Sequence, residues 1–200
     1  HIFPSAIGIW IGNSGWNRIL HNRIFNRNYT GISCGWTWGY APTRTVCNRI
    51  EHNHIHHIND REILSDNGGI YTLGVQPGTV LRGNLIHDIE KAHYGGWCIY
   101  LDEGSSHILV EGNVCYRTND TVFNQHYGRE NLVRNNIFAL GRVHQLSRGR
   151  PEPHQSMFFE NNIVYWDTGV LLRGPWDRVK HESRKNCFFH AAGEPVVFLG

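Results

Sequence analysis

An asparagine followed two residues later by an apolar residue recurs along the whole chain, and this repeat restricts the possible folds more than any other feature. Successive copies are 23 to 31 residues apart, which leaves room for one turn of a solenoid with loops of different lengths. The chain shows almost no helical periodicity, so each repeat is expected to form one coil of short strands. The seven pairs are Asn22/Ile24, Asn53/Ile55, Asn84/Ile86, Asn113/Cys115, Asn136/Phe138, Asn162/Val164 and Asn186/Phe188.

A second set of short apolar runs has a similar spacing and predicts one strand in each coil. The runs cover residues 8–10, 31–33, 69–71, 98–100, 122–124, 145–147 and 169–171, the last centred on Val170. Most of them end within a few residues at a glycine, as expected where a strand turns sharply. The predicted fold class is therefore all-β, a right-handed parallel β-helix of about seven coils. In such a solenoid equivalent residues stack about 4.8 Å apart, and inward asparagines form a hydrogen-bonded ladder.

Composition limits the classes of protein to which this chain can belong. Its 200 residues are 40% hydrophobic, enough for the core of one domain spanning residues 1–200, which we expect to be part of a longer protein or a truncated form. The net charge is only +2 and the basic residues are spread along the chain, so no nucleic-acid partner is expected. No run approaches the roughly 20 apolar residues of a membrane span, so no membrane partner is expected either.

Three segments carry a resemblance to known proteins: SDNGGIYTLG at 65–74, GGWCIYLDEGSS at 95–106 and QHYGREN at 125–131. Together with the repeats, they resemble the right-handed parallel β-helix superfamily of pectate-lyase-like proteins. More narrowly, they are similar to bacterial β-helix proteins grouped with glycoside hydrolase family 141. The resemblance implies a secreted or periplasmic, carbohydrate-active enzyme that hydrolyses glycosidic bonds of a plant-type or microbial polysaccharide and needs no cofactor. Its expected partner is that polysaccharide or an oligosaccharide.

Strand alternation predicts a cluster of side chains on the outer surface. If Ile70, Ile99 and Phe123 face inward, the residues three positions after the last two, Asp102 and His126, face outward on neighbouring coils about 5 Å apart. A carboxylate beside an imidazole suits acid and base catalysis, although the same arrangement also occurs as an ordinary surface pair. The outward positions directly after the aligned residues hold Tyr71, Tyr100 and Asn124.

Glycosidases typically use two carboxylates, and the partner of Asp102 is open at the sequence level. Glu103 follows it directly but points the other way unless Gly104 ends the strand early. Asp66 would be roughly 23 Å from Asp102 on straight strands, so it can contribute to catalysis only if the chain before it folds back. The sequence Asp-Asn-Gly-Gly at this position is also typical of a turn in which the aspartate only caps its own backbone. Glu130 is the remaining nearby candidate.

Aromatic and basic residues are expected to border this cluster. Residues 35–40 are too aromatic for a solvated loop, so their rings either stack on sugar or form a lid over the coil edge. The candidate sugar-contacting rings are Trp36, Trp38, Tyr40 and Trp97. Arg148 and Arg150 lie one coil after His126 and are expected to close the side of the substrate groove opposite the aromatic residues.

Histidines in the segment 51–57 raise the possibility of a metal site. His52, His54 and His56 share a strand face, and alternating histidines can ligate zinc or copper. However, His87 occupies the same repeat position as His56, so histidine there belongs partly to the repeat. No metal site is therefore expected.

Two other functions compete with hydrolysis. In a polysaccharide lyase or epimerase, Arg148, Arg150 or Arg129 would neutralise a uronate while His126 or a tyrosine removes the neighbouring proton. The chain could also be a non-catalytic carbohydrate-binding β-helix or an inactive fragment.

The ends of the solenoid need cover, because a terminal coil exposes apolar surface and unpaired strand edges. Ile2 and Phe3 at one end, and Val197, Phe198 and Leu199 at the other, are expected to cover these ends or to mediate self-association.

Overall fold

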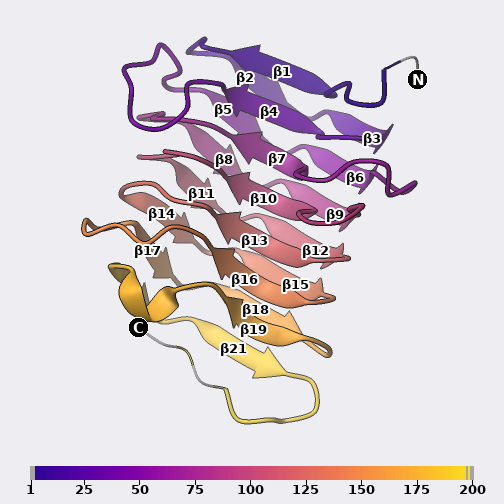
Figure 1. The fold of residues 1–200 in the computed structure, drawn as a ribbon, viewed down its shortest axis with the longest axis vertical. Coiled ribbons are helices and arrows are strands. Elements are labelled where there is room, and N and C mark those ends of the chain that lie inside the picture. Colours follow the sequence, from indigo (N-terminus) through magenta and orange to yellow (C-terminus); the bar gives the residue numbers. More distant parts are fainter. Residues whose placement is uncertain (1–2, 197, 199–200) are drawn as a thin grey trace.

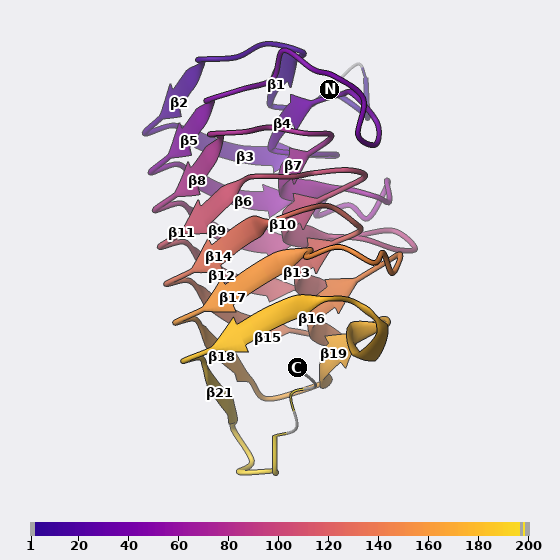
Figure 2. The ribbon, with the colours of Figure 1, turned by 90° about the vertical axis from the view of Figure 1, so that its left-hand side faces the viewer.

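The computed structural model describes residues 3–196 and residue 198, and it forms a β-solenoid of three parallel sheets (Figure 1). Each sheet has seven strands, and the chain visits sheets A, B and C once per coil. Figure 1 looks onto sheet A, and Figure 2 shows the coils stacked along the long axis of the molecule. The prediction of an all-β parallel β-helix of about seven coils is confirmed.

The strands are short and similar in length from coil to coil. Sheet A contains β1 (Ile9–Gly12), β4 (Ile32–Gly35), β7 (Gly68–Thr72), β10 (Trp97–Leu101), β13 (Thr121–Gln125), β16 (His144–Arg148) and β19 (Val170–Arg173). Sheet B contains β2 (Arg18–Leu20), β5 (Arg49–Glu51), β8 (Val80–Arg82), β11 (Leu109–Glu111), β14 (Asn131–Arg134), β17 (Met157–Glu160) and β20 (His181–Arg184). Sheet C contains β3 (Arg23–Arg27), β6 (His54–Ile58), β9 (Leu85–Ile89), β12 (Val114–Thr118), β15 (Ile137–Gly141), β18 (Ile163–Trp166) and β21 (Cys187–His190).

Stacked apolar side chains fill the interior of the solenoid. Ile70, Ile99 and Phe123 pair in register across β7, β10 and β13 and are fully buried, as the alignment predicted. The last coil differs from the prediction, because Leu146 of β16 pairs with Leu172 and not with Val170. Gly169 adopts a left-handed turn conformation before β19, and the residue equivalent to Leu146 lies two positions later than the sequence suggested.

The repeated asparagines form the predicted ladder at the corner between sheets B and C. The Oδ1 atom of Asn84 accepts hydrogen bonds from the backbone nitrogen and the Nδ2 atom of Asn53, both at 3.0 Å. Asn84 in turn donates to Asn113 in the same way, and the pattern continues to Asn136 and Asn162. Their side chains thus satisfy buried polar groups at the corner, which explains the repeat without a role in binding.

The two ends of the solenoid are covered differently. At the C-terminal end Phe198 stacks on Phe188, with ring centroids 4.7 Å apart, and also contacts Trp176. At the other end Phe3 is 72% exposed and forms no such cover. Ile2, Val197 and Leu199 lie outside the described residues.

Helix is almost absent from the described part of the chain. One short 3-10 helix, η1 (Trp176–Arg178), follows the last strand of sheet A. No helix among residues 3–196 is long and apolar enough to cross a membrane.

Candidate functional site

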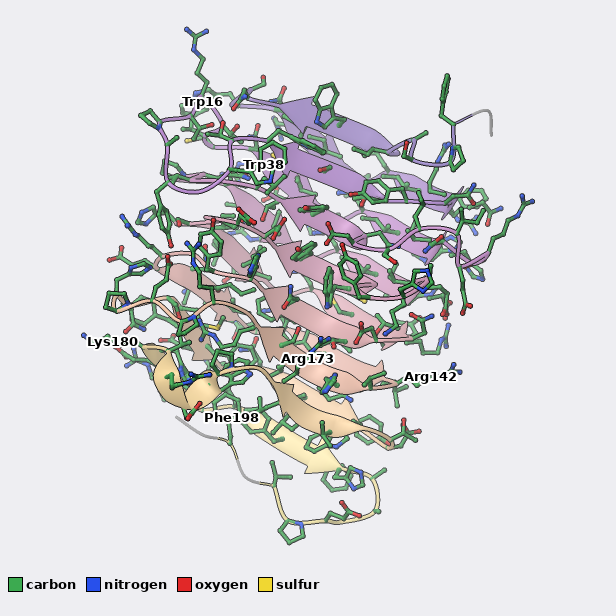
Figure 3. All side chains as sticks on the ribbon, viewed as in Figure 1. Trp16, Trp38, Arg142, Arg173, Lys180 and Phe198 are labelled. Carbon is green, nitrogen blue, oxygen red and sulfur yellow. The ribbon has the colours of Figure 1, made fainter. Side chains whose placement is uncertain are left out.

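The outer face of sheet A forms the floor of the candidate site. Tyr71, Tyr100 and Asn124 stack in register there, as the alternation predicted. Asn124 is followed by Ser147 and then Arg173, whose side chain lies over this sheet (Figure 3). Because the row runs parallel to the solenoid axis, residues from five coils contribute to one surface.

Asp102 and His126 form a hydrogen-bonded dyad just beyond the ends of β10 and β13. The Nδ1 atom of His126 lies 3.0 Å from Oδ1 of Asp102, and the hydroxyl of Tyr71 donates to Oδ2 of Asp102 at 2.5 Å. A carboxylate oxygen can only accept, so Nδ1 carries the proton and Nε2 is left to face a ligand. The predicted stacking of these two residues is confirmed.

Burial and hydrogen bonding set the charge states of the dyad. Burial would raise the pKa of Asp102, but hydrogen bonds led by those of His126 and Tyr71 outweigh it and leave the pKa below its usual value. The hydrogen bond to Asp102 raises the pKa of His126, with burial opposing the shift. Asp102 is therefore ionised near neutral pH and stabilises the protonated imidazole beside it.

Gly149 follows at the equivalent position one coil beyond His126 and makes room for the imidazole. A Cβ atom on Gly149 would lie 2.3 Å from Cδ2 and 3.2 Å from Nε2 of His126. Two non-bonded carbon atoms do not approach so closely, so the ring needs a glycine at this position to keep its orientation.

Asp66 joins the site because the chain between β6 and β7 leaves the sheet and folds back. Its backbone nitrogen donates to the carbonyl of Tyr94 at 3.0 Å, and its φ of 59° places it in a left-handed turn. Burial and then the charge of Asp102 raise the pKa of Asp66, while a hydrogen bond from Tyr100 opposes the shift. The separation of roughly 23 Å applies only to straight strands; the fold-back is the condition under which Asp66 was expected to contribute, and the charge of Asp102 helps to raise its pKa.

Glu103 also reaches the site, because β10 ends at Leu101 and the chain turns there. The hydroxyl of Tyr127 donates to its Oε2 atom at 3.0 Å, and its charge contributes to the raised pKa of His126. Glu130, the fourth candidate carboxylate, points to His107 at 3.5 Å and is largely exposed.

The candidate sugar-stacking rings differ in accessibility. Trp38 is exposed and contacts Trp36 edge to face, with ring centroids 5.4 Å apart. Trp97 packs against Tyr100 in a tilted arrangement with ring centroids 4.1 Å apart, and both rings, like that of Tyr71, are buried. Tyr71 therefore supports Asp102 with its hydroxyl, and neither Tyr71 nor Tyr100 presents an open ring face.

Tyr40 and Arg150 lie on the same side of the site, so the expectation that they border opposite sides is wrong. Both contact Tyr127: the Tyr40 ring at 5.8 Å between centroids, and the Arg150 guanidinium at 3.5 Å over the ring. The hydroxyl of Tyr40 donates to Glu152, which also pairs with Arg150. The two loops meet because each follows a strand of sheet A at the same edge of the sheet.

Arg148 does not close the groove either, because its side chain points inward. Arg148 pairs in register with Gln125, which pairs with the buried Leu101. Its Nη2 atom donates to Ser156 at 2.7 Å, and its guanidinium lies over Trp176. Strict alternation after the inward Leu146 explains this orientation.

A cavity of about 210 Å³ opens beside the dyad. The sequence pointed to several of its residues but not to Tyr94, Ser147, Gly149 or Arg173. Arg173 was missed because aligning the last coil on Val170 shifts it by two positions. The cavity is lined by Tyr94, Trp97, Tyr100, Asn124, His126, Ser147, Arg148, Gly149 and Arg173.

The histidines of sheet C form a stack on a different face of the solenoid. His56 and His87 pair in register, and their rings lie parallel at 5.2 Å. His54 approaches His87 with the two Nε2 atoms 2.8 Å apart, whereas His52 stacks on His21. Within residues 3–196 and 198, no three histidine, cysteine, aspartate or glutamate side chains are arranged to hold a metal ion.

Comparison of the chain with models of protein families, with curated proteins and with solved structures finds no match. The fold and the geometry of the site therefore carry the functional argument.

Proposed function

We propose that this protein is a carbohydrate-active enzyme that hydrolyses glycosidic bonds of a polysaccharide at the outer face of sheet A. One observation carries the proposal: Asp66 and His126 both interact with the ionised Asp102, and both have a raised pKa. An acid and a base work best when their pKa values lie near the working pH, and both shifts go in that direction.

Each group has a defined task in this proposal. The carboxylate of Asp66 takes a proton from a water molecule whose oxygen attacks the anomeric carbon. The protonated His126 gives its Nε2 proton to the departing glycosidic oxygen, and Asp102 stabilises the imidazolium until then. Water is thus added across the broken bond, and exchange with solvent restores the proton to His126 and removes the one on Asp66.

The resemblance of the segments 65–74, 95–106 and 125–131 to glycoside hydrolase family 141 supports the same activity. A secreted or periplasmic location belongs to this proposal, because polysaccharide substrates are met outside the cytoplasm.

Substitution of the three ionisable residues tests the proposal. On a panel of plant and microbial polysaccharides, wild type should release reducing ends, and Asp66→Asn, Asp102→Asn and His126→Ala should each lower kcat by about 10²-fold or more. The exposed Asp167 provides a matched control, so Asp167→Asn should retain full activity. The pH profile should be bell-shaped, with an acidic limb above the usual aspartate pKa and a basic limb above the usual histidine pKa. Full activity in all three variants would refute this assignment.

Cleavage of a uronate-containing chain by β-elimination is a second candidate, favoured by Arg173 and His126 lining the same cavity. Arg173 would neutralise the uronate, and neutral His126 would remove the neighbouring proton. An unsaturated product that absorbs in the ultraviolet would establish elimination and rule out hydrolysis. Binding of glycans without turnover of any of them would instead favour a non-catalytic β-helix.

A further inference from the structure

Asp66 lies in a loop, so its position beside the dyad must be fixed by contacts outside the strands of sheet A. The loop covers residues 59–67, between β6 and β7, and is hydrogen-bonded to the loop of residues 90–96, between β9 and β10. Both loops lie on the same side of the molecule (Figure 1). A loop that carries a functional side chain needs such support, because a displacement of about 1 Å can cost about 10²-fold in rate.

Asn59 organises the first of these loops from within. The residue is fully buried, and its Oδ1 atom accepts hydrogen bonds from the backbone nitrogens of Ile63 at 3.0 Å and Leu64 at 3.2 Å. Its Nδ2 group donates to the carbonyl of Leu64 in the same loop and to that of Glu90 in the neighbouring coil, the latter at 3.3 Å. One amide thus folds the chain back and ties it to the next coil, just before Asp66.

A second set of hydrogen bonds joins the two loops at Asp66 itself. The Oγ atom of Ser65 accepts from the backbone nitrogens of His93 at 3.0 Å and Tyr94 at 3.4 Å. The backbone nitrogen of Asp66 donates to the carbonyl of Tyr94 at 3.0 Å. Gly95 allows this close approach, because its φ of 73° favours glycine and a Cβ atom there would lie only 3.1 Å from the Cα atom of Asp66.

The supporting loop is anchored in turn by Asp120, in the turn between β12 and β13. The Oδ2 atom of Asp120 accepts hydrogen bonds from Nζ of Lys91 at 2.9 Å and from the backbone nitrogen of Gly95 at 3.2 Å. Burial would raise the pKa of Asp120, but hydrogen bonds from His144 and Lys91 outweigh it and hold the pKa well below its usual value. This buried, charged carboxylate fixes both ends of the loop 90–96, so the connections of three consecutive coils cooperate to place Asp66.

We propose that Asn59 and Ser65 are positioning residues for Asp66, which they hold beside Asp102 by fixing the loop 59–67 against the loop 90–96. This inference rests on the proposed function, in which Asp66 is the base, and names the residues that keep the base in place. The hydrogen bonds of Asn59 and Ser65 go to backbone atoms of the two loops. Loss of either side chain can therefore affect the Asp66 carboxyl only by moving it. The side chains that act on this carboxyl are Asp102, Tyr100, His126 and Glu103.

The pKa of Asp66 in the variant Asn59→Gly tests the inference without a known substrate. Glycine keeps the left-handed backbone of Asn59, whose φ is 62°, and removes only the amide. Release of the loop should expose Asp66 to solvent and move it away from the charge of Asp102, so its raised pKa, followed by carboxyl-carbon NMR, should fall towards the ordinary value. On a glycan that wild type hydrolyses, kcat should fall about tenfold or more with little change in KM, and the acidic limb should move to lower pH.

A second variant and a matched control separate positioning from general stability. Ser65→Ala keeps the buried amide of Asn59 and should shift the pKa of Asp66 in the same direction by a smaller amount. Asn113 is equally buried, and its amide is likewise bonded through both Oδ1 and Nδ2. Asn113→Gly should therefore lower Tm comparably and leave the pKa of Asp66 unchanged.

The failure of this inference and the failure of the proposed function give different results. An Asp66 pKa that stays unchanged in both Asn59→Gly and Ser65→Ala, or that shifts equally in Asn113→Gly, would overturn the inference, and hydrolysis by wild type would still support the function. The expected pKa shifts in a protein that turns over no glycan would refute the function alone.

Discussion

At the scale of single residues, the site depends on side chains that occupy one position in successive coils. Leu73, Asp102, His126 and Gly149 follow the inward residues of β7, β10, β13 and β16 at the same offset, and backbone hydrogen bonds hold consecutive members in register. Stacking therefore places the carboxylate of Asp102 next to the imidazole of His126. The apolar Leu73 precedes this pair, and Gly149, which has no side chain, follows it.

The space provided by Gly149 leads to a prediction about a positioning residue. In Gly149→Ala the new methyl group would displace the His126 ring and weaken its hydrogen bond to Asp102. The pKa of His126, followed by NMR titration, should fall towards its ordinary value, and kcat should drop about tenfold or more with little change in KM. An unchanged pKa together with full activity would show that the ring does not depend on this glycine.

At the scale of elements, sheet C carries a stack of rings on its outer face. Phe25, His56, His87 and Tyr116 follow one another on neighbouring strands, with centroids 4.8 to 5.3 Å apart and nearly parallel planes. The parallel register of the strands imposes this spacing. Protonation of His56 would place a positive charge among these closely packed rings, so the stack is sensitive to acid.

The acid sensitivity of this stack can be measured. Burial and neighbouring histidines lower the pKa of His54 and bring the pKa of His56 to about 4. The unfolded chain then binds more protons than the folded one, so this contribution to stability is complete above pH 6.5 and is lost as the pH falls from about 6.5 to about 4. His56→Phe keeps a ring in the stack without the titration, and its Tm should fall about 3–6 °C less than that of wild type over this range.

A control substitution separates this effect from general acid denaturation. His93 is exposed, so His93→Phe should follow the wild-type profile. Identical acid profiles for wild type and His56→Phe would mean that the stack is not the source of the sensitivity.

At the scale of the whole molecule, the solenoid is a linear stack whose stability depends on its ends. Each strand pairs with the equivalent strands of the neighbouring coils, and the last coil is closed by Phe198 lying against Phe188 and Trp176. At the other end β1, β2 and β3 are the terminal strands of their sheets. We propose that the protein self-associates through a solenoid end, since strand edges and apolar coil surfaces meet there.

Removal of the C-terminal cover should expose such a surface. Phe198→Ala is expected to lower the free energy of unfolding by about 2–3 kcal/mol and to promote concentration-dependent association, measured by urea denaturation and by light scattering after gel filtration. Phe3→Ala removes an exposed ring of the same type and should change neither measurement. A monomeric Phe198→Ala protein of unchanged stability would contradict a capping role for this ring.

The sequence by itself determined the fold, the number of coils, the asparagine ladder and the pairing of Asp102 with His126. All four follow from the repeat length and from strand alternation, which are local properties that recur in every coil. The same alternation, applied strictly, would also have placed Arg148 inside. The start of the last coil was misjudged because the run of Val170, Leu171 and Leu172 offers several apolar residues that can face inward.

Only the tertiary structure decided which loop residues reach the dyad. Asp66 arrives through a segment that folds back over the sheet, and Tyr40 meets Arg150 because both of their loops leave sheet A at one edge. Loops between coils differ in length and carry no repeat, so their positions depend on packing against residues far away in the chain. Strand periodicity therefore predicts the floor of the site, whereas its second carboxylate and its walls come from long-range contacts that no local pattern encodes.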